Sequence, residues 1–276
     1  MKRLIIRPGA IGDFIVSIPA MECLRSGYLE IWAAQRNVPL AARIAQHARS
    51  IASTGLDMLE VTGPNARLIE TLRGFDSIVS WYGANRLEFR EAVAGLRLPF
   101  QFFTALPAEG SGVHAADFYL EQARSIAACA SDGIPRIKCD GIRGVSAVIH
   151  PFAGSPKKRW PLERFRELAH TLARRMPVEW CAGPEDDLPG AQRFDDLYEL
   201  AGWLAAARIY IGNDSGATHL AAAVGTPVVA LFGPSDPAVW APRGPHVAIA
   251  RAHAMDSITV EQVASLVWKT LEDSRP

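Results

Sequence analysis

The stretch YIGNDSGATHLAAAVGTPVVALFGPSDP, residues 210–237, decides the fold of this chain. It predicts a short strand, a sharp polar turn at 212–216 and a helix over about 217–223, followed by a buried strand at 228–232 that ends in a second polar turn, GPSDP. Two such turns in succession lie side by side at the carboxyl edge of a parallel sheet, where open α/β sheets bind ligands. The backbone N–H groups that begin the helix favour an anion there, such as a phosphate.

The composition excludes several classes of protein. Of the 276 residues 49% are hydrophobic, so a substantial core can form and disorder is not expected. Lys and Arg together number 29, as do Asp and Glu, so the overall charge does not indicate a nucleic-acid partner. No apolar run approaches the roughly 20 residues that cross a bilayer. The four cysteines lack a metal-ligand spacing, so we expect thiols of a reducing compartment in a soluble, cytoplasmic protein.

Short apolar runs alternate with amphipathic stretches of helix length, which predicts parallel sheets with crossover helices. The expected strands are residues 3–6, 30–33, 77–81, 100–103, 145–150, 178–182, 197–200 and 247–250, besides those of the opening stretch. The expected helices are residues 14–24, 39–47, 66–72, 87–96, 115–128, 162–176, 203–207 and 259–271, again besides the opening stretch. Periodicity lapses over residues 130–144, which we interpret as a linker. The fold class is therefore α/β, with two Rossmann-like domains, residues 1–142 and 143–276, whose parallel sheets face each other across a cleft.

The loop RPGAIGD, residues 7–13, joins the first expected strand to the first expected helix. Its glycines, Gly12 among them, suit a tight turn, but it has neither the GxGxxG spacing of a dinucleotide site nor a Walker A lysine. Dinucleotide and simple P-loop chemistry are therefore disfavoured. Asp13 has two interpretations: it caps the following helix, or it is a carboxylate at the mouth of the cleft that acts as a general base.

The loop HPFAGSPKKRWP, residues 150–161, places three consecutive cations after a Gly-Ser turn and directly before a helix. It is either a solvated basic loop or an anion site that includes Ser155, Lys158 and Arg159. The second interpretation gains weight because this loop and the turn at 212–216 leave the same edge of the same predicted sheet.

Two further positions have open interpretations. Glu185, Asp186 and Asp187 follow a strand, where acids bind a metal or a ribose, or form a solvated turn and helix cap; we favour the turn for the two aspartates and leave Glu185 open. His219 lies in the first turn of the helix after the 212–216 turn. It either contacts a ligand or is a buried histidine with local hydrogen bonds.

Together these segments resemble glycosyltransferase family 9, the ADP-heptose:lipopolysaccharide heptosyltransferases. RPGAIGDFIVSIPA is similar to the family's N-terminal loop, HPFAGSPKKRWP to its basic phosphate loop, and GNDSGATHLAAAVGTPVVALFGPSDP to its nucleotide-sugar signature. The resemblance implies a GT-B architecture, with residues 1–142 as the acceptor-side domain and 143–276 as the donor domain. It also implies inverting sugar transfer from an ADP-heptose to a glycan such as the lipopolysaccharide core, with no metal and no cofactor. The chain has no DxD motif, which agrees with a metal-independent reaction.

The resemblance also implies roles for single residues. Asp13 matches the general base, and Lys158 matches the lysine that meets the donor diphosphate. The residues implied in donor binding are Gly12, Ser155, Lys158, Arg159, Glu185, Asp214, Ser215, Gly216 and His219.

The acceptor is the least determined part of this hypothesis. Five arginines, Arg36, Arg43, Arg49, Arg67 and Arg73, are available for an anionic sugar acid, although arginines on helix surfaces are ordinarily solvated. We expect an ADP-sugar donor, a glycan or lipid-linked glycan acceptor, no nucleic acid, and peripheral contact with the cytoplasmic face of the inner membrane. The alternatives are a non-transferring GT-B relative, such as a nucleotide-sugar epimerase or hydrolase, and an inactive nucleotide-sugar-binding protein.

Overall fold

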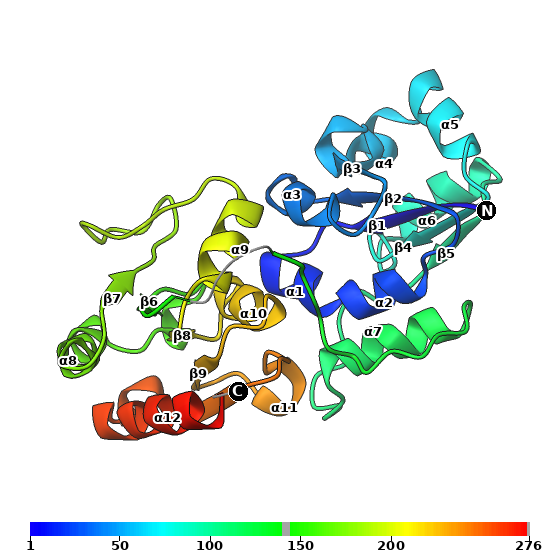
Figure 1. The fold of residues 1–276 in the computed structure, drawn as a ribbon. Helices are drawn as coiled ribbons and strands as arrows, with labels where there is room; N and C mark the ends of the chain where they lie inside the picture. The colour runs from blue at the N-terminus through cyan, green and yellow to red at the C-terminus, as the bar shows by residue number, and fades with distance from the viewer. Residues whose placement is uncertain (140–143, 275–276) are drawn as a thin grey trace. The chain divides into compact units, whose positions relative to one another are not determined.

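The computed structural model describes residues 1–139 and 144–274, which form two compact units (Figure 1). Unit 1 comprises Met1–Ser111 and Ala115–Asp132, and unit 2 comprises Gly112–His114 and Gly133–Pro276. The expected domain boundary between residues 142 and 143 lies outside the described residues. By the bounds of the two units, the chain enters unit 2 briefly at Gly112–His114 before it returns to complete unit 1.

Unit 1 contains a parallel sheet of five strands in the order β3-β2-β1-β4-β5. The strands are β1 (Lys2–Arg7), β2 (Tyr28–Ala33), β3 (His47–Ser50), β4 (Ser77–Ser80) and β5 (Phe100–Phe102). The chain adds strands to one side of β1 and then to the other, so the order reverses between β1 and β4. A doubly wound sheet binds ligands at the carboxyl side of such a switch point.

The side chains of β1 alternate between the two faces of this sheet, and helices cover both faces. Leu4 and Ile6 pack into a core with residues of α5 and α6, while Arg3 and Arg7 point toward the α2 and α7 face, where they bond to Leu24 and Ser17. The helices are α1 (Ile11–Val16), α2 (Ile18–Cys23), α3 (Val38–Ala41), α4 (Leu59–Thr62), α5 (Ala66–Arg73), α6 (Leu87–Gly95) and α7 (Ala115–Arg124), with the 3₁₀ turns η1 (Gln35–Asn37), η2 (Ile51–Ser53) and η3 (Leu56–Met58).

Unit 2 repeats this plan with a parallel sheet in the order β10-β9-β8-β6-β7. The strands are β6 (Ala147–His150), β7 (Val178–Trp180), β8 (Ile209–Asn213), β9 (Val228–Phe232) and β10 (Val247–Arg251). Here the order reverses between β6 and β8. The basic loop follows β6 and the polar turn follows β8, so both leave the same edge of the sheet, as the sequence predicts. The strand order adds that this is the switch point of unit 2.

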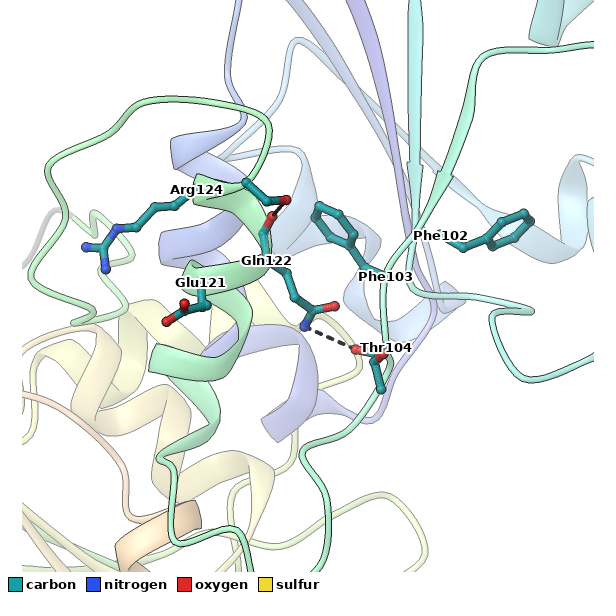
Figure 2. A pocket seen from close by; sticks show the side chains of 7 residues that line it. Phe102, Phe103, Thr104, Glu121, Gln122 and Arg124 are labelled. Atoms are coloured by element: carbon teal, nitrogen blue, oxygen red, sulfur yellow. Dashed lines mark hydrogen bonds between the residues drawn. The ribbon is translucent and has the colours of Figure 1, made fainter.

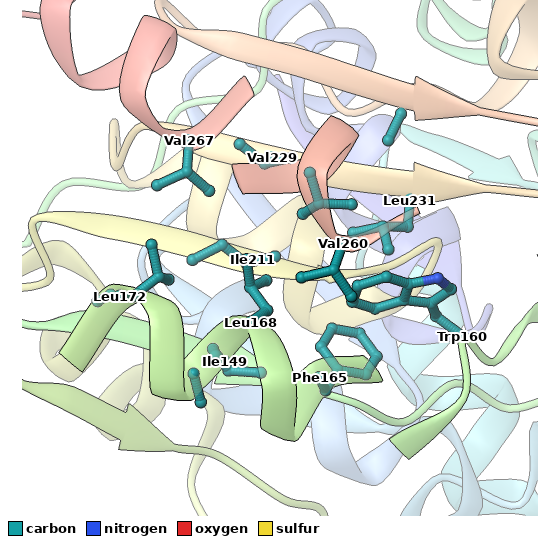
Figure 3. Close-up of a cluster of buried hydrophobic side chains, with 14 of the residues drawn as sticks. Ile149, Trp160, Phe165, Leu168, Leu172, Ile211, Val229, Leu231, Val260 and Val267 are labelled. Atoms are coloured by element: carbon teal, nitrogen blue, oxygen red, sulfur yellow. The ribbon is translucent and has the colours of Figure 1, made fainter. Parts of the chain in front are cut away.

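One face of the unit 2 sheet is closed by two long amphipathic helices, α8 (Leu162–Ala173) and α12 (Val260–Asp273). Figure 3 shows Trp160, Phe165 and Val267 packed over the apolar side chains of the central strands. The remaining elements are η4 (Pro156–Lys158), α9 (Leu197–Ala205), α10 (Gly216–Ala223), α11 (Pro237–Trp240) and η5 (Met255–Ser257). The buried core fixes the sheet from which the functional loops project.

Three expected elements are wrong. Residues 197–200 begin α9 rather than a strand, because Asp196 caps a helix there by accepting hydrogen bonds from the backbone N–H groups of Tyr198 and Glu199 at 2.6 and 3.2 Å. The expected helix 39–47 ends at Ala41, and His47–Ser50 forms the edge strand β3. The expected helix 14–24 is two short helices that meet at Ser17.

The expectation that all cysteines are thiols is also wrong. Cys23, at the end of α2, forms a disulfide with Cys129, beyond the end of α7, with 5.4 Å between their Cα atoms. Cys139 and Cys181 are not in a disulfide. The bond joins positions 106 residues apart, and nothing in the cysteine spacing indicates that pairing.

Candidate functional site

The basic loop of unit 2 is fixed at both ends by one amide side chain at the end of β8. Asn213 donates through Nδ2 to the Pro151 carbonyl at 2.8 Å, and its Oδ1 accepts from the Trp160 backbone N–H at 3.0 Å. Trp160 is itself buried, and its indole N–H donates to the Ile258 carbonyl at 2.9 Å. The residues between Pro151 and Trp160 are therefore held at the carboxyl edge of the sheet.

Three strand-end loops meet at a single carboxylate oxygen. Oδ2 of Asp214, in the turn after β8, lies 2.6 Å from the ammonium of Lys158, in the loop after β6. The same oxygen accepts a hydrogen bond of 2.6 Å from the hydroxyl of Ser235, in the loop after β9. The Asp214 side chain is 7% exposed and that of Lys158 36%, so the carboxylate is buried while the cation reaches solvent.

The N-terminus of α10 lies in the same turn and has no side-chain cap. Ser215 occupies the N-cap position in an extended conformation, and its side chain does not bond to the backbone of the helix. The hydroxyl of Thr218 instead donates to the Asn213 carbonyl at 2.5 Å. The first amides of α10 therefore remain available at the positive end of the helix dipole, an arrangement that favours an anion.

His219 is buried in α10, close to Asp214. Burial lowers the pKa of its imidazole to about 4, against the opposing effect of the Asp214 carboxylate. The positive charge of Lys158 and the proximity of His114 lower the pKa further. His219 is therefore a neutral imidazole at pH 7.

The other predicted donor residues differ in their surroundings. Arg159 donates to the Ala153 carbonyl at 2.8 Å and lies over the Phe152 ring, so its guanidinium holds the shape of the loop. Ser155 is the N-cap residue of η4, and its carbonyl accepts from the Lys158 N–H at 3.0 Å. Glu185 is exposed in the loop after β7, where Asp186 accepts from the Gly183 N–H at 2.9 Å, as expected of a turn residue.

In unit 1, Gly12 and Asp13 lie in the first turn of α1, after β1. The N-cap of that helix is Ala10, so the interpretation of Asp13 as the cap is wrong. Arg7 is 3% exposed, and it donates to the backbone carbonyl of Asp13 at 3.0 Å. A Cβ atom added at Gly9 would lie 3.0 Å from the Cβ of Asp13, a tight contact, so the close turn of the loop favours glycine there.

Sequence reasoning missed three residues that organise these loops: Arg7, Asn213 and Ser235. All three lie inside motifs that the sequence indicated, but none has a role assigned by motif. The partners of Asn213 and Ser235 come from other loops, so the strand order reveals them, whereas Arg7 donates to Asp13 of its own loop. The signal that could have found Ser235 is its place after β9, next to β8 in the sheet.

Two hollows lie in unit 1, and neither contains a residue predicted to bind the donor. One, of about 610 Å³, lies between the end of β5 and α7; Figure 2 shows Gln122 directed toward Thr104, with Glu121 and Arg124 pointing elsewhere. The other, of about 300 Å³, lies beside Trp32 and is lined by Arg49 and Arg67, two of the arginines considered for the acceptor. Arg49 is in β3 rather than on a helix, and it pairs with buried Glu30 at 2.9 Å.

Within residues 1–139 and 144–274, the helices are all too short or too polar to cross a membrane. The same residues contain no group of three or more His, Cys, Asp or Glu side chains arranged to hold a metal ion.

Residues 114–267 match the family described as "Glycosyltransferase family 9 (heptosyltransferase)". The chain belongs to glycosyltransferase family 9. The match covers all three loops that meet at Asp214, and most of unit 2. In this family 9 protein, the matched residues therefore include the unit that contains the candidate anion site.

Curated relatives of the protein match over part of its length. Lipopolysaccharide heptosyltransferase 3 of Escherichia coli (strain K12) is 31% identical over 147 residues, which is 46% of this chain and 42% of that protein. Lipopolysaccharide heptosyltransferase 1 of the same strain is 30% identical over 124 residues, 40% of this chain and 38% of that protein. The matched stretch thus spans about two-fifths of the length of these relatives.

Solved structures match over the whole chain. The E. coli ADP-heptose lps heptosyltransferase II has a TM-score of 0.77 at 18% identity and covers 99% of both chains. A glycosyl transferase family 9 protein from Veillonella parvula scores 0.75 at 19% identity, with 99% of this chain and 98% of that one covered. The E. coli heptosyltransferase WaaC with ADP scores 0.73 at 16% identity, with 98% and 100% covered. The predicted α/β fold class, with two Rossmann-like domains of the GT-B architecture, is confirmed.

Proposed function

We propose that this family 9 protein is an inverting glycosyltransferase that moves a sugar, a heptose, from an ADP-sugar donor to a glycan acceptor. The observation that carries the proposal is the contact of Lys158 with Asp214 beside the uncapped N-terminus of α10. The curated relatives are named lipopolysaccharide heptosyltransferases, and one similar structure was solved with ADP.

Unit 2 would hold the donor diphosphate. The ammonium of Lys158 has three N–H donors, and its contact with Asp214 uses one of them, which leaves the others for phosphate oxygens. The first amides of α10 add backbone donors, and Gly216 lets a phosphate approach them closely. Ser155 and Arg159, on the same loop as Lys158, would complete the phosphate contacts. Neutral His219 and Glu185 would contact the parts of the donor other than its diphosphate.

Unit 1 would supply the base. Asp13 takes the proton of the acceptor hydroxyl as that oxygen attacks the anomeric carbon, and the bond from that carbon to the β-phosphate oxygen breaks. Negative charge then grows on the departing ADP, where Lys158 and the positive end of α10 stabilise it. Because the acceptor oxygen attacks the face opposite the leaving group, the configuration at the anomeric carbon inverts.

Unit 1 would also bind the acceptor. The hollow beside Trp32 carries Arg49 and Arg67, and Asn65 and Thr54 add neutral hydrogen-bonding groups. Two guanidinium groups suit an anionic sugar acid such as those of a lipopolysaccharide core. We propose the lipopolysaccharide core as the acceptor and the cytoplasmic face of the inner membrane as the place of reaction.

The deciding experiment measures ADP release from ADP-heptose, with and without lipopolysaccharide core acceptors. Release that requires the acceptor is the expected result. Release without an acceptor, yielding free or isomerised sugar, would indicate an epimerase or hydrolase. Binding without turnover would indicate an inactive nucleotide-sugar-binding protein.

A thermal-shift comparison tests the donor separately. We expect ADP to raise the unfolding temperature more than UDP or GDP at equal concentration, because binding to the folded state alone stabilises it. Equal shifts from all three nucleotides would contradict an ADP-specific donor site.

A further inference from the structure

We propose that Ser235 is a positioning residue for the donor site: it fixes the Asp214 carboxylate and, through it, aims the Lys158 ammonium at the diphosphate. The inference rests on the proposed function, in which Lys158 binds that diphosphate. It adds the loop after β9 to the site, as a part that sets the geometry without touching the donor.

The contact geometry supports an indirect role. Ser235 Oγ and Lys158 Nζ both lie 2.6 Å from the same oxygen of Asp214, one from the loop after β9 and the other from the loop after β6. The backbone of Asp214 is fixed as well, because its N–H donates to the Leu231 carbonyl at 3.0 Å. The side chain of Asp214 can still rotate about its own bonds. The hydroxyl of Ser235 removes that freedom by holding the carboxylate from the side of β9.

The charges explain why this position matters to the cation. Lys158 is a flexible side chain with 36% of its surface exposed, so without a fixed partner it samples several positions in solvent. Asp214 is the acidic side chain with which the structure pairs it. A carboxylate held in place converts this mobile cation into a fixed one. Binding then costs less side-chain entropy, because the ammonium is ordered before the diphosphate arrives.

The neighbouring Asp236 offers a matched control in the same loop. Its Oδ1 accepts from the Ala238 N–H at 3.1 Å and lies 3.5 Å from Arg251, and its contacts do not include Asp214. Asp236→Asn keeps an oxygen for the helix cap while it changes the charge of the loop. A general disturbance of the loop would affect this variant as well.

The test measures ADP affinity by calorimetry for the wild-type protein, Ser235→Ala, Ser235→Thr and Asp236→Asn. We expect Ser235→Ala to weaken ADP binding by about three- to tenfold, since the lost hydrogen bond acts on ADP only through the position of Lys158. Ser235→Thr, which retains the hydroxyl, and Asp236→Asn should bind ADP like the wild type. Equal affinity of Ser235→Ala and the wild type would overturn the proposal.

A double-mutant cycle with Lys158→Ala separates positioning from direct contact. If Ser235 acts through Lys158, then Ser235→Ala should weaken ADP binding little further once Lys158 is absent. Full additivity would overturn the positioning role, since it would mean that Ser235 acts on the donor independently of Lys158. Wild-type protein that does not bind ADP would instead contradict the proposed function itself, so the two failures are distinguishable.

Discussion

The two units have the same sheet plan but differ in how their switch-point loops are held. In unit 2, side chains from different loops bond to one another, and Asp214 and Asn213 each join separate loops. In unit 1, the Arg7 guanidinium donates to the backbone carbonyl of Asp13 and so holds the loop. The structure records no hydrogen bond or ion pair between the Asp13 carboxylate and another described residue. The difference fits the proposal that unit 2 holds the donor diphosphate and that Asp13 in unit 1 serves as the base.

The largest effect is expected from the substitution Asp13→Asn, which separates the role of unit 1 from that of unit 2. General-base catalysis is typically worth ~10²–10⁴ in rate, so turnover should fall on that scale. ADP affinity should not change, because the proposed donor contacts of Lys158 and Asp214 lie in unit 2. Initial rates of ADP release and calorimetry on the same preparation check both parts. Wild-type turnover in Asp13→Asn would remove the base from the mechanism.

The disulfide provides a comparison in stability, since it lies wholly within unit 1. A crosslink between positions 106 residues apart restricts the unfolded chain, so its loss should destabilise unit 1 by about 4–5 kcal/mol. We expect Cys23→Ser/Cys129→Ser to lower the unfolding transition of unit 1 and to leave ADP binding unchanged. Denaturant unfolding measures this change, with Cys139→Ser as the control. Identical unfolding of wild-type protein with and without reductant would contradict it.

Acid should affect unit 2 through two buried histidines. Burial lowers the pKa values of His150 and His219 from 6.5 to about 4 in the folded protein. The unfolded chain therefore binds protons first as pH falls, so stability is full above about pH 6.5 and is lost progressively toward pH 4. Each histidine accounts for about 3 kcal/mol across that window.

The acid prediction is tested by replacing one of these two histidines. His150 lies near Asp186 and Arg159, and His219 near Asp214, His114 and Lys158. Denaturant titrations at pH 7 and pH 4.5 should show a smaller loss for the variant His219→Gln than for the wild type. An equal loss in both would mean that His219 does not drive the acid sensitivity.

A smaller effect is expected from a comparison of two adjacent lysines. Lys158→Ala should weaken ADP binding roughly 10- to 100-fold, because one charged hydrogen-bond donor to the diphosphate is removed. Lys157→Ala should change it little, because the Lys157 side chain is exposed and the structure gives it no ion pair among the described residues. Calorimetry on both variants measures this difference. Equal losses would indicate that the loop binds ADP by its overall charge alone.

The sequence predicts the strands, turns and helix around the candidate site of unit 2 well because their signals are local. Glycine and polar residues mark the turn at 212–216, and the following helix, expected from about residue 217, begins at Gly216. The three cations mark the loop after β6 in the same way. The sequence places the turns after β8 and β9 side by side, but it does not show which side chains meet there. The bond from Ser235 to Asp214 depends on the register of the two strands.

Errors in the predicted fold arise where local pattern and tertiary context differ. The strand β3 has the sequence HARS, which lacks apolar alternation, and it forms because β2 offers it a parallel partner. Residues 197–200 are apolar enough for a strand, but the Asp196 cap and the nine-residue run favour α9. The pairing of Cys23 with Cys129 depends on the packing of α2 against α7, which the spacing of the cysteines does not express.

The short passage of Gly112–His114 into unit 2 affects how one unit could be exchanged for another by recombination. His114 lies 2.9 Å, through Nε2, from the Ala241 carbonyl just after α11, and the family match begins at this residue. The chain crosses between the units after Ser111, after His114 and after Asp132. A recombination event at the Asp132 linker alone would give a new partner a unit 2 that lacks His114. An exchange that keeps unit 2 of this chain intact therefore has to include α7 and the loop before it.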